Sequence, residues 1–272
     1  MKREEIRIFI LRVGGTNCDE ETKRAFRDSR MDAEVGHFNQ LVKEKNLLDY
    51  DALVIPGGFS HGDYVRAGAI WAKQIMAKLG KEVKTFVDEE RPILGICNGF
   101  QVLIEAGLLP QFDGISNFPE AALGANIPAG YNCRWIHLTN ESNGRCVFTR
   151  RIRKGSIIRI PIAHSEGRFM FSKECERKYL ERLLDNDQLV FRYCQHDGKY
   201  PDGRYPSNPN GSFYDIAGIC DPSGTILGLM PHPERAYYGW QLPDWTKNDK
   251  IPAFGDGRII FESVAEYLTK KF

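Results

Sequence analysis

Three short apolar segments in the first hundred residues each run into a turn-forming sequence. They are residues 6–13 (IRIFILRV), residues 52–56 (ALVIP) and residues 92–96 (PILGI). The first two precede Gly-Gly pairs, and the third precedes a cysteine that lies between glycines. Continuous apolar runs of this length are typical of strands buried on both faces, as in a parallel sheet. The pattern therefore predicts three buried strands.

Segments with helical character lie between these strands. Residues 19–30 (DEETKRAFRDSR) carry acids in the first turn and bases at the end, an order that the helix dipole favours. Residues 67–79 (AGAIWAKQIMAKL) place Trp71, Ile75 and Leu79 on one side of a helix. The alternation of strand and helix predicts an α/β fold, with a doubly wound, mostly parallel sheet flanked by helices.

After residue 110 the apolar segments become shorter and alternate with turn signals. Residues 216–229 (IAGICDPSGTILGL) are typical of a hairpin, because the central DPSG favours a turn. We expect these segments to add antiparallel strands to the sheet. The expected strands are residues 134–140, 155–164, 189–195, 215–220 and 225–231, and the expected helices are residues 172–187 and 261–271.

The composition is that of an ordinary globular protein. Of the 272 residues, 42% are hydrophobic and 27% are charged, so a sizeable core can form. The 37 Lys and Arg residues nearly balance the 36 Asp and Glu residues, and a net charge of +1 gives nucleic-acid binding no support. No linker rich in Pro, Gly or Ser divides the chain, so residues 1–272 are predicted to form a single domain.

The seven cysteines are scattered, and no two are spaced as Cys-x-x-Cys. This argues against a disulfide framework and against a four-cysteine zinc site, so no metal site is predicted. Glu4, Glu5 and Arg7 interrupt the apolar start of the chain, which is too charged for a signal peptide. Since no run approaches the roughly 20 apolar residues of a membrane span, we expect no membrane partner and a cytoplasmic location.

Cys97 occupies the centre of a Gly-x-Cys-x-Gly sequence between the strand at 92–96 and a predicted helix at 100–108. This is the cysteine form of a nucleophile elbow, in which a sharp turn exposes the nucleophile above a sheet. The following helix would favour the thiolate, and the N–H of Asn98 would stabilise an oxyanion. A buried structural cysteine is the simpler alternative, and the sequence context gives the two about equal weight.

His232 lies in LGLMPHPERA, directly after an apolar strand. Prolines on both sides favour extended backbone, in which His232 and Glu234 share a face. A carboxylate beside an imidazole orients it and stabilises its charged form. The alternative for an isolated histidine is a solvated loop, but a cysteine elbow elsewhere in the chain favours a catalytic pair.

Gly57 and Gly58 follow another strand, where their N–H groups could complete an oxyanion hole. Alone, a Gly-Gly turn is weak evidence. The spacing matches neither a dinucleotide fingerprint nor a phosphate-binding loop, so the chain shows no ATP-binding signature.

Taken together, these motifs resemble the glutaminase subunits of phosphoribosylformylglycinamidine synthase, a family of class I (triad) glutamine amidotransferases. The resemblance spans nearly the whole chain. Residues 95–101 and the His-Pro-Glu sequence are shared with the wider class, whereas residues 56–69 and 163–169 are more diagnostic of this family. The similar stretches are PGGFSHGDYVRAGA, GICNGFQVLIEAGLLP, IPIAHSEGRF, NPNGS, IAGICDPSG and GLMPHPERA.

The resemblance implies that Cys97 attacks the side-chain amide of glutamine, forming a thioester and releasing ammonia. By the same resemblance, His232 moves the protons and Glu234 orients His232. It further implies an oxyanion hole of Gly58 and Asn98, and a glutamine-binding role for Gln101 and Gly57.

Residues 163–169 (AHSEGRF) add His164, Glu166 and Arg168 as a candidate loop near the site or the partner surface. A polar turn between two elements is an equally weighted alternative. Family members commonly read His-Gly-Glu-Gly here, so Ser165 is a departure that leaves the local turn less certain.

In this family a separate large subunit carries the ATP-dependent synthesis, and a small third subunit completes the complex. The resemblance therefore implies no cofactor on this chain, with ATP and Mg on the partner. Residues 115–150 and 241–257 are candidate insertions, and the second is consistent with a surface loop or a partner contact.

Three rival functions remain at this stage. Another triad amidotransferase would share Cys97, His232 and Glu234 but is not expected to carry GGFSHGDYVRAGA or AHSEGRF. A peptidase-like or stress-response protein of similar architecture typically lacks the C-terminal His-x-Glu. A non-catalytic subunit with this fold is disfavoured because all three triad residues are present.

Overall fold

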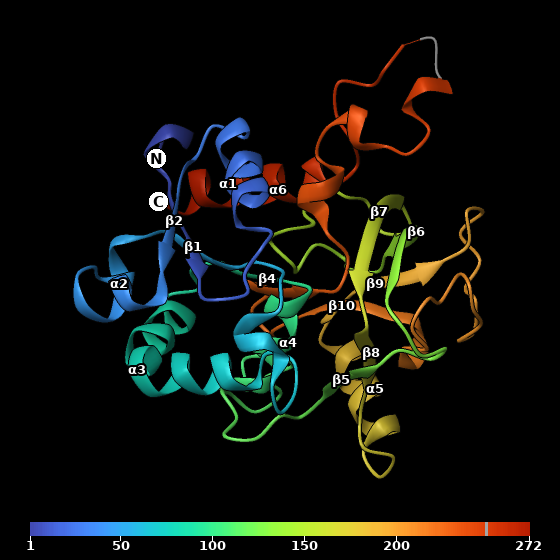
Figure 1. The fold of residues 1–272 in the computed structure, drawn as a ribbon, viewed down its shortest axis with the longest axis horizontal. Coiled ribbons are helices and arrows are strands. Elements are labelled where there is room, and N and C mark those ends of the chain that lie inside the picture. The colour runs from blue at the N-terminus through green and yellow to red at the C-terminus, as the bar shows by residue number, and fades with distance from the viewer. Residues whose placement is uncertain (248–249) are drawn as a thin grey trace.

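The computed structural model describes residues 1–247 and 250–272 (Figure 1). The strands are β1 (Arg7–Arg12), β2 (Asp32–His37), β3 (Ala52–Ile55), β4 (Ile93–Ile96), β5 (Ala122–Ala125), β6 (Asn132–Asn140), β7 (Ile157–His164), β8 (Glu166–Met170), β9 (Leu189–Cys194), β10 (Ile216–Cys220) and β11 (Ile226–Leu229). The α-helices are α1 (Asp19–Asp28), α2 (Phe38–Lys43), α3 (Ala69–Asp88), α4 (Asn98–Glu105), α5 (Glu176–Asp185) and α6 (Arg258–Lys271).

The main sheet has the strand order β2-β1-β3-β4-β11-β10-β9-β6-β7. Neighbouring strands in the part β2-β1-β3-β4-β11 are parallel. The neighbouring strands in the part β11-β10-β9-β6-β7 are antiparallel. Every residue of β3, β4 and β11 is buried, which explains their continuous apolar sequences. The α/β fold with added antiparallel strands is thus confirmed, including the hairpin of β10 and β11.

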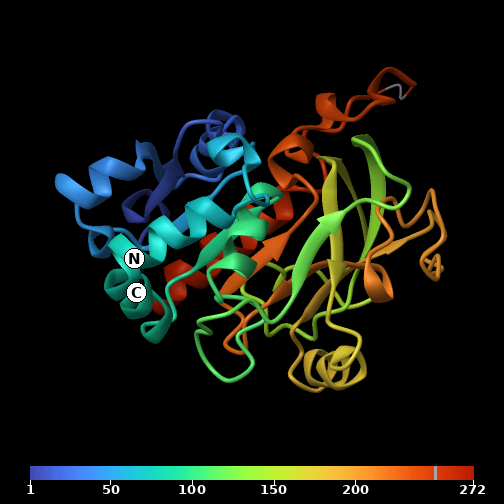
Figure 2. The same cartoon turned by 60° about the horizontal axis from the view of Figure 1, so that its bottom comes forward.

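Helices cover both faces of the parallel half. Helix α1 contacts β1, β2 and α6, whereas α4 contacts α3 and packs on β3, β4 and β11. Figures 1 and 2 show α1 with α6 on one face and α3 with α4 on the other. This is the two-sided cover that a doubly wound sheet requires.

Several elements differ from the sequence prediction. Helix α2 and strands β2, β5 and β8 were not predicted, and α5 begins at Glu176 instead of residue 172. Strand β2 is missing from the prediction because this edge strand pairs only with β1 and mixes buried and exposed residues instead of forming an apolar run. Helix α3 is longer than predicted, because Val83 and Phe86 continue its buried face past Gly80. Among the described residues, no helix has the length and apolar character needed to cross a membrane.

The two candidate insertions have different structures. Residues 115–150 include β5, which pairs with β8, and β6, which joins the main sheet between β9 and β7. Residues 241–257 run mostly exposed through short 3-10 turns and extend away from the body in Figure 1, with residues 248 and 249 lying outside the described residues. The expected surface segment is therefore the second one.

The parallel order places three strand ends together. Strands β3, β4 and β11 are adjacent, and their carboxyl ends lead directly to Gly57, Cys97 and His232. In an open α/β sheet, ligands bind outside the carboxyl ends of the strands. The three sequence-predicted motifs therefore lie together at the carboxyl ends of adjacent parallel strands.

We expect Gly99→Ala to destabilise the fold. A Cβ atom at Gly99 would lie 1.8 Å from the carbonyl oxygen of Ile55, so α4 would have to move off β3. Overpacking of this kind costs about 1–3 kcal/mol or more in the free energy of unfolding, which urea denaturation measures.

The matched control is Gly80→Ala. Gly80 lies inside α3, and a Cβ atom there would have no described neighbour within 4 Å, so alanine should be neutral or stabilise the chain by up to about 1 kcal/mol. Equal stability of the two variants would contradict the close approach of α4 to β3.

Candidate active site

Cys97 sits at the junction of β4 and α4 in a strained backbone conformation. Its φ is 53° and its ψ is −106°, an arrangement that residues with a side chain rarely adopt. The two flanking glycines permit the turn. A Cβ atom at Gly95 would lie 2.7 Å from the carbonyl oxygen of Gly99, and one at Gly99 would strike Ile55. The predicted elbow is therefore present in the structure, and the glycine spacing follows from close packing.

His232 and Glu234 form a buried pair after β11. Nδ1 of His232 lies 2.6 Å from Oε1 of Glu234, and both side chains are at most 2% exposed. The backbone N–H of His232 donates to the carbonyl of Pro161 on β7, which fixes the histidine. The backbone is extended at His232, but Glu234 lies in a 3-10 turn (Pro233–Ala236) instead of the extended segment predicted. The turn nevertheless brings the two side chains together.

The surroundings of His232 favour its protonated form. Burial by itself lowers the pKa of His232, but the charges of Glu234 and Cys97 raise it well above its usual value. Its buried Nε2 has no hydrogen-bond partner among the described residues. Both residues border Gly57, so the structure brings the sequence-predicted cysteine and histidine together.

Gly57 lies beside the side chains of both Cys97 and His232. A Cβ atom here would be 2.8 Å from Cε1 of His232, 3.1 Å from Sγ of Cys18 and 3.5 Å from Cβ of Cys97. A side chain at Gly57 would therefore displace the ring of His232, whereas its contact with Cys97 would be an ordinary one.

The backbone N–H groups of Gly58 and Asn98 are candidate donors to a ligand at Cys97. Neither Gly58 nor Asn98 donates its N–H to a backbone carbonyl of the described residues. Gly58 has a φ of 150° and approaches Gly15 so closely that a Cβ atom would lie 2.5 Å from its carbonyl oxygen. Free N–H groups at this position could stabilise a negatively charged oxygen.

The side chain of Asn98 connects the segments around the cysteine. Its Nδ2 donates to Oε1 of Gln101 at 2.9 Å and to Oδ1 of Asp63 at 3.2 Å, and its Oδ1 accepts from the N–H of Ser60. Gln101 in turn donates to the carbonyl of Glu166 at 2.5 Å. Asn98, Gln101 and the strand β8 are thus joined, and this network includes Asp63, a residue that sequence reasoning did not single out.

Residues His164, Glu166 and Arg168 lie on strands instead of a loop. His164 ends β7, and Glu166 and Arg168 lie two residues apart on β8, so they share one face of that strand. His164 is 4% exposed, and burial, followed by the charge of His232, lowers its pKa to about 3. A neutral, buried histidine cannot belong to an exposed partner surface, and a role for the other two residues stays a prediction.

Cys18 is a second thiol in the site, and no motif in the sequence points to it. Nη2 of Arg235 lies 2.9 Å from its Sγ, and burial raises the pKa of the thiol. Ligand atoms of Cys18, His232 and Glu234 all lie within 4.8 Å of one another, a spacing that could hold a metal ion. The absence of a metal site stays a prediction from the sequence.

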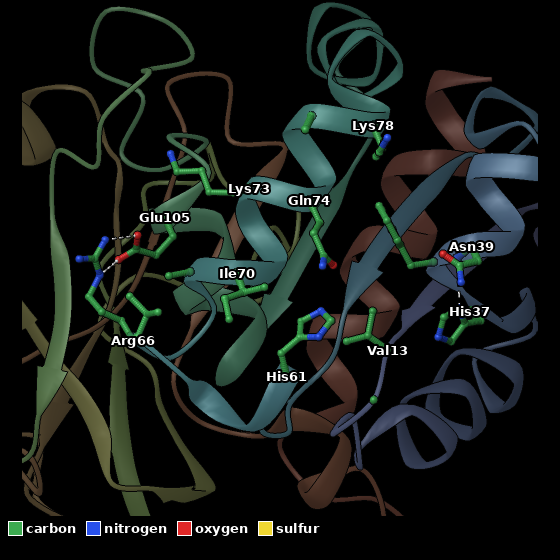
Figure 3. Close-up of a pocket in the computed structure, with 15 residues that line it drawn as sticks. Val13, His37, Asn39, His61, Arg66, Ile70, Lys73, Gln74, Lys78 and Glu105 are labelled. Carbon is green, nitrogen blue, oxygen red and sulfur yellow. Dashed lines mark hydrogen bonds and ion pairs between the residues drawn. The ribbon is translucent and has the colours of Figure 1, made fainter.

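A large cavity lies beside the site and does not contain the triad. It has a volume of about 870 Å³ and runs along α3, where His61, Ile70 and Gln74 face one another in Figure 3. At one end Arg66 forms two 2.7 Å hydrogen bonds with Glu105. This cavity is therefore separate from the arrangement around Cys97.

The chain matches the family model of the CobB/CobQ-like glutamine amidotransferase domain over residues 5–268. It is 46% identical over 280 residues to the phosphoribosylformylglycinamidine synthase subunit PurQ of Archaeoglobus fulgidus, covering 99% of this chain and 100% of that protein. The same subunit of Methanothrix thermoacetophila is 43% identical over 276 residues, covering 98% and 99%. The structure of PurLQS from Thermotoga maritima superposes with a TM-score of 0.72 at 31% identity, covering 97% of this chain and 99% of that chain.

We expect Glu234→Gln to lower the pH at which His232 loses its proton. The carboxylate is the strongest of the groups that raise the pKa of His232, and a neutral amide of the same shape removes that charge. Nitrogen-15 NMR titration of the imidazoles measures the shift directly.

His164 provides an internal control in the same spectra. Its pKa is about 3 because of burial and the charge of His232, so it should stay neutral above pH 5 in both proteins. Titration of His232 at the same pH in both proteins would rule out Glu234 as the group that holds its proton.

Proposed function

The chain belongs to the family of CobB/CobQ-like glutamine amidotransferase domains, and we propose that Cys97, His232 and Glu234 are the triad with which it hydrolyses L-glutamine to glutamate and ammonia. It is a glutaminase subunit of phosphoribosylformylglycinamidine synthase, an enzyme of purine biosynthesis. That synthase converts formylglycinamide ribonucleotide to its amidine with ATP and with glutamine as amide donor.

The first step forms a thioester. The thiolate of Cys97 attacks the side-chain amide carbon of glutamine, and the carbonyl oxygen becomes negatively charged. The N–H groups of Gly58 and Asn98, which have no backbone acceptor among the described residues, stabilise that oxygen. His232 gives its proton to the departing nitrogen, so the C–N bond breaks and ammonia leaves.

The second step returns the enzyme to its starting state. Neutral His232 takes a proton from water, and the resulting hydroxide attacks the thioester carbon. The C–S bond breaks, glutamate leaves, and Cys97 is again a thiolate beside a protonated His232. Glu234 stabilises His232 whenever the ring is protonated, because its Oε1 lies 2.6 Å from Nδ1.

The observation on which this mechanism rests is the charge arrangement at His232. Its side chain is only 2% exposed, and Nδ1 is paired with Glu234. Nε2 has no hydrogen-bond partner among the described residues, and the charge of Cys97 raises the pKa of the ring. A nucleophile, a base and an orienting carboxylate in this order are the parts that thiol-based acyl transfer needs.

We further propose that the ammonia passes to a large synthetase subunit, which binds ATP and Mg, and that a small third subunit completes the complex. The name PurLQS of the Thermotoga maritima structure supports such an assembly. The chain itself carries no phosphate-loop sequence, and no cofactor is proposed for it. Residues 1–272 would act as one domain, because one main sheet includes strands from both halves. The seven free thiols are consistent with a reducing cytoplasm.

We expect an electrophilic glutamine analogue to label Cys97 alone among the seven cysteines. Cys97 combines the helix N-terminus with the protonated His232, whereas burial raises the pKa of Cys18 and Cys194, and the neighbouring Cys146, followed by burial, raises that of Cys220. Intact mass and peptide mapping, with and without excess L-glutamine, provide the measurement. Labelling that spreads over several cysteines, or that glutamine does not block, would count against Cys97 as the glutamine nucleophile.

We expect Cys97→Ser to abolish glutamine-dependent synthesis by the reconstituted complex while synthesis from added ammonium salt continues. The serine hydroxyl is a far weaker nucleophile beside the same histidine, and a loss of at least about 10³-fold is expected. Ammonia-dependent synthesis is the control for folding and assembly. Loss of both activities would assign Cys97 a structural role instead.

A further inference from the structure

Two carboxylates, those of Asp63 and Glu166, lie beside the proposed glutamine site. The groups of the described chain that shift the pKa of Asp63 are burial, then Glu166, then Asn98, and none of them is a cation. Burial and the charge of Glu166 together raise this pKa to about 6. Two carboxylates that repel each other next to a substrate site leave room for a positively charged ligand group.

The backbone holds Asp63 in a fixed and strained position. Its φ is 53°, and His61 and Val65 on either side also have positive φ values, of 53° and 73°. Residues other than glycine adopt such values at a cost, and surrounding contacts must maintain them. The contact here is the hydrogen bond from Nδ2 of Asn98 to Oδ1 of Asp63 at 3.2 Å. The carboxylate is therefore positioned by the residue that directly follows the nucleophile.

Glu166 lies on strand β8, next to the helix that carries Asn98 and Gln101, and its charge acts on Asp63. Gln101, on the first turns of α4, donates to the backbone carbonyl of Glu166, so β8 lies against the helix that follows Cys97. Independently of these acids, Nε2 of His232, which is buried and has no partner among the described residues, marks where the amide end of a substrate must lie. In glutamine the α-nitrogen is only about 5 Å from the amide carbon, so both ends must bind within this small region.

We propose that Asp63 and Glu166 bind the α-ammonium group of L-glutamine and thereby select an α-amino acid amide over other amides. This inference rests on the proposed function, because it requires Cys97 to attack the same molecule. An ammonium group has three donors and can be shared between two carboxylates. Binding it relieves the repulsion between Asp63 and Glu166, so the positive charge itself contributes to substrate selection.

The test compares two substrates on three proteins. L-Glutamine and 4-carbamoylbutanoate, which lacks only the α-amino group, are offered to the complex assembled with wild-type chain, Asp63→Asn or Asp113→Asn. Released ammonia reports both reactions. The amide oxygen that Asp63→Asn introduces can still accept the bond from Asn98, so only the charge is lost. Asp113→Asn is the matched control, because Asp113 is an exposed acid paired with Arg182 on the surface.

We expect Asp63→Asn to lower kcat/KM for L-glutamine by roughly 10-fold to 100-fold, mainly by raising KM, the range for loss of one charge-assisted hydrogen bond. Activity toward 4-carbamoylbutanoate should change by less than about 3-fold, and Asp113→Asn should change neither. Glu166→Gln should act in the same direction as Asp63→Asn.

Equal loss for both substrates in Asp63→Asn would mean that Asp63 acts structurally through Asn98, and no loss for glutamine would remove it from the site. Either result would overturn the inference while leaving wild-type glutaminase activity intact. If the wild-type complex itself released no ammonia from glutamine, the proposed function would fail instead.

Discussion

The close approach of α4 to β3 is the constraint on which the site depends. Because Gly99 has no side chain, the first turn of α4 lies against the carbonyl of Ile55, and the chain must turn within one residue between β4 and α4. Cys97 is that residue, and it adopts a positive φ as a result. The strain at Cys97 is therefore imposed by packing on both sides, and it directs the sulfur to the strand edge where His232 arrives.

Asn98 carries this constraint outward from the nucleophile. One residue after Cys97, its side chain bonds to the segment after β3 through Ser60 and Asp63, and to α4 through Gln101. Three hydrogen bonds hold the side chain of Asn98 and so keep its backbone N–H in a fixed direction. A donor that stabilises a developing oxyanion must be oriented in advance in this way. The proposed oxyanion donor and the proposed substrate contacts are thus held by the same buried amide.

The sequence predicted the parts of the fold that repeat a simple pattern. Buried parallel strands such as β3, β4 and β11 are continuous apolar runs, and a Gly-x-Cys-x-Gly sequence between strand and helix predicted an elbow about as strongly as a buried structural cysteine. The edge strand β2 was missed because its buried and exposed residues form no apolar run. Cys18 and Asp63 were missed as site residues because they approach Cys97 through tertiary packing, across more than thirty residues of sequence, which no local pattern encodes.

Two buried histidines that lie close to each other have opposite pKa shifts: the pKa of His164 is lowered and that of His232 is raised. His164 and His232 are both almost fully enclosed, and burial lowers the pKa of both. Among the described residues, Nδ1 of His164 is paired with the neutral amide of Asn126, so the ring stays uncharged, and it packs against Gly167. His232 has Glu234 at the same nitrogen, and the charges of Glu234 and Cys97, with the nearby Cys18 thiol, together outweigh the desolvation cost. A carboxylate instead of an amide beside Nδ1, together with the nearby Cys97, therefore distinguishes the ring that can carry a proton in the proposed thioester chemistry.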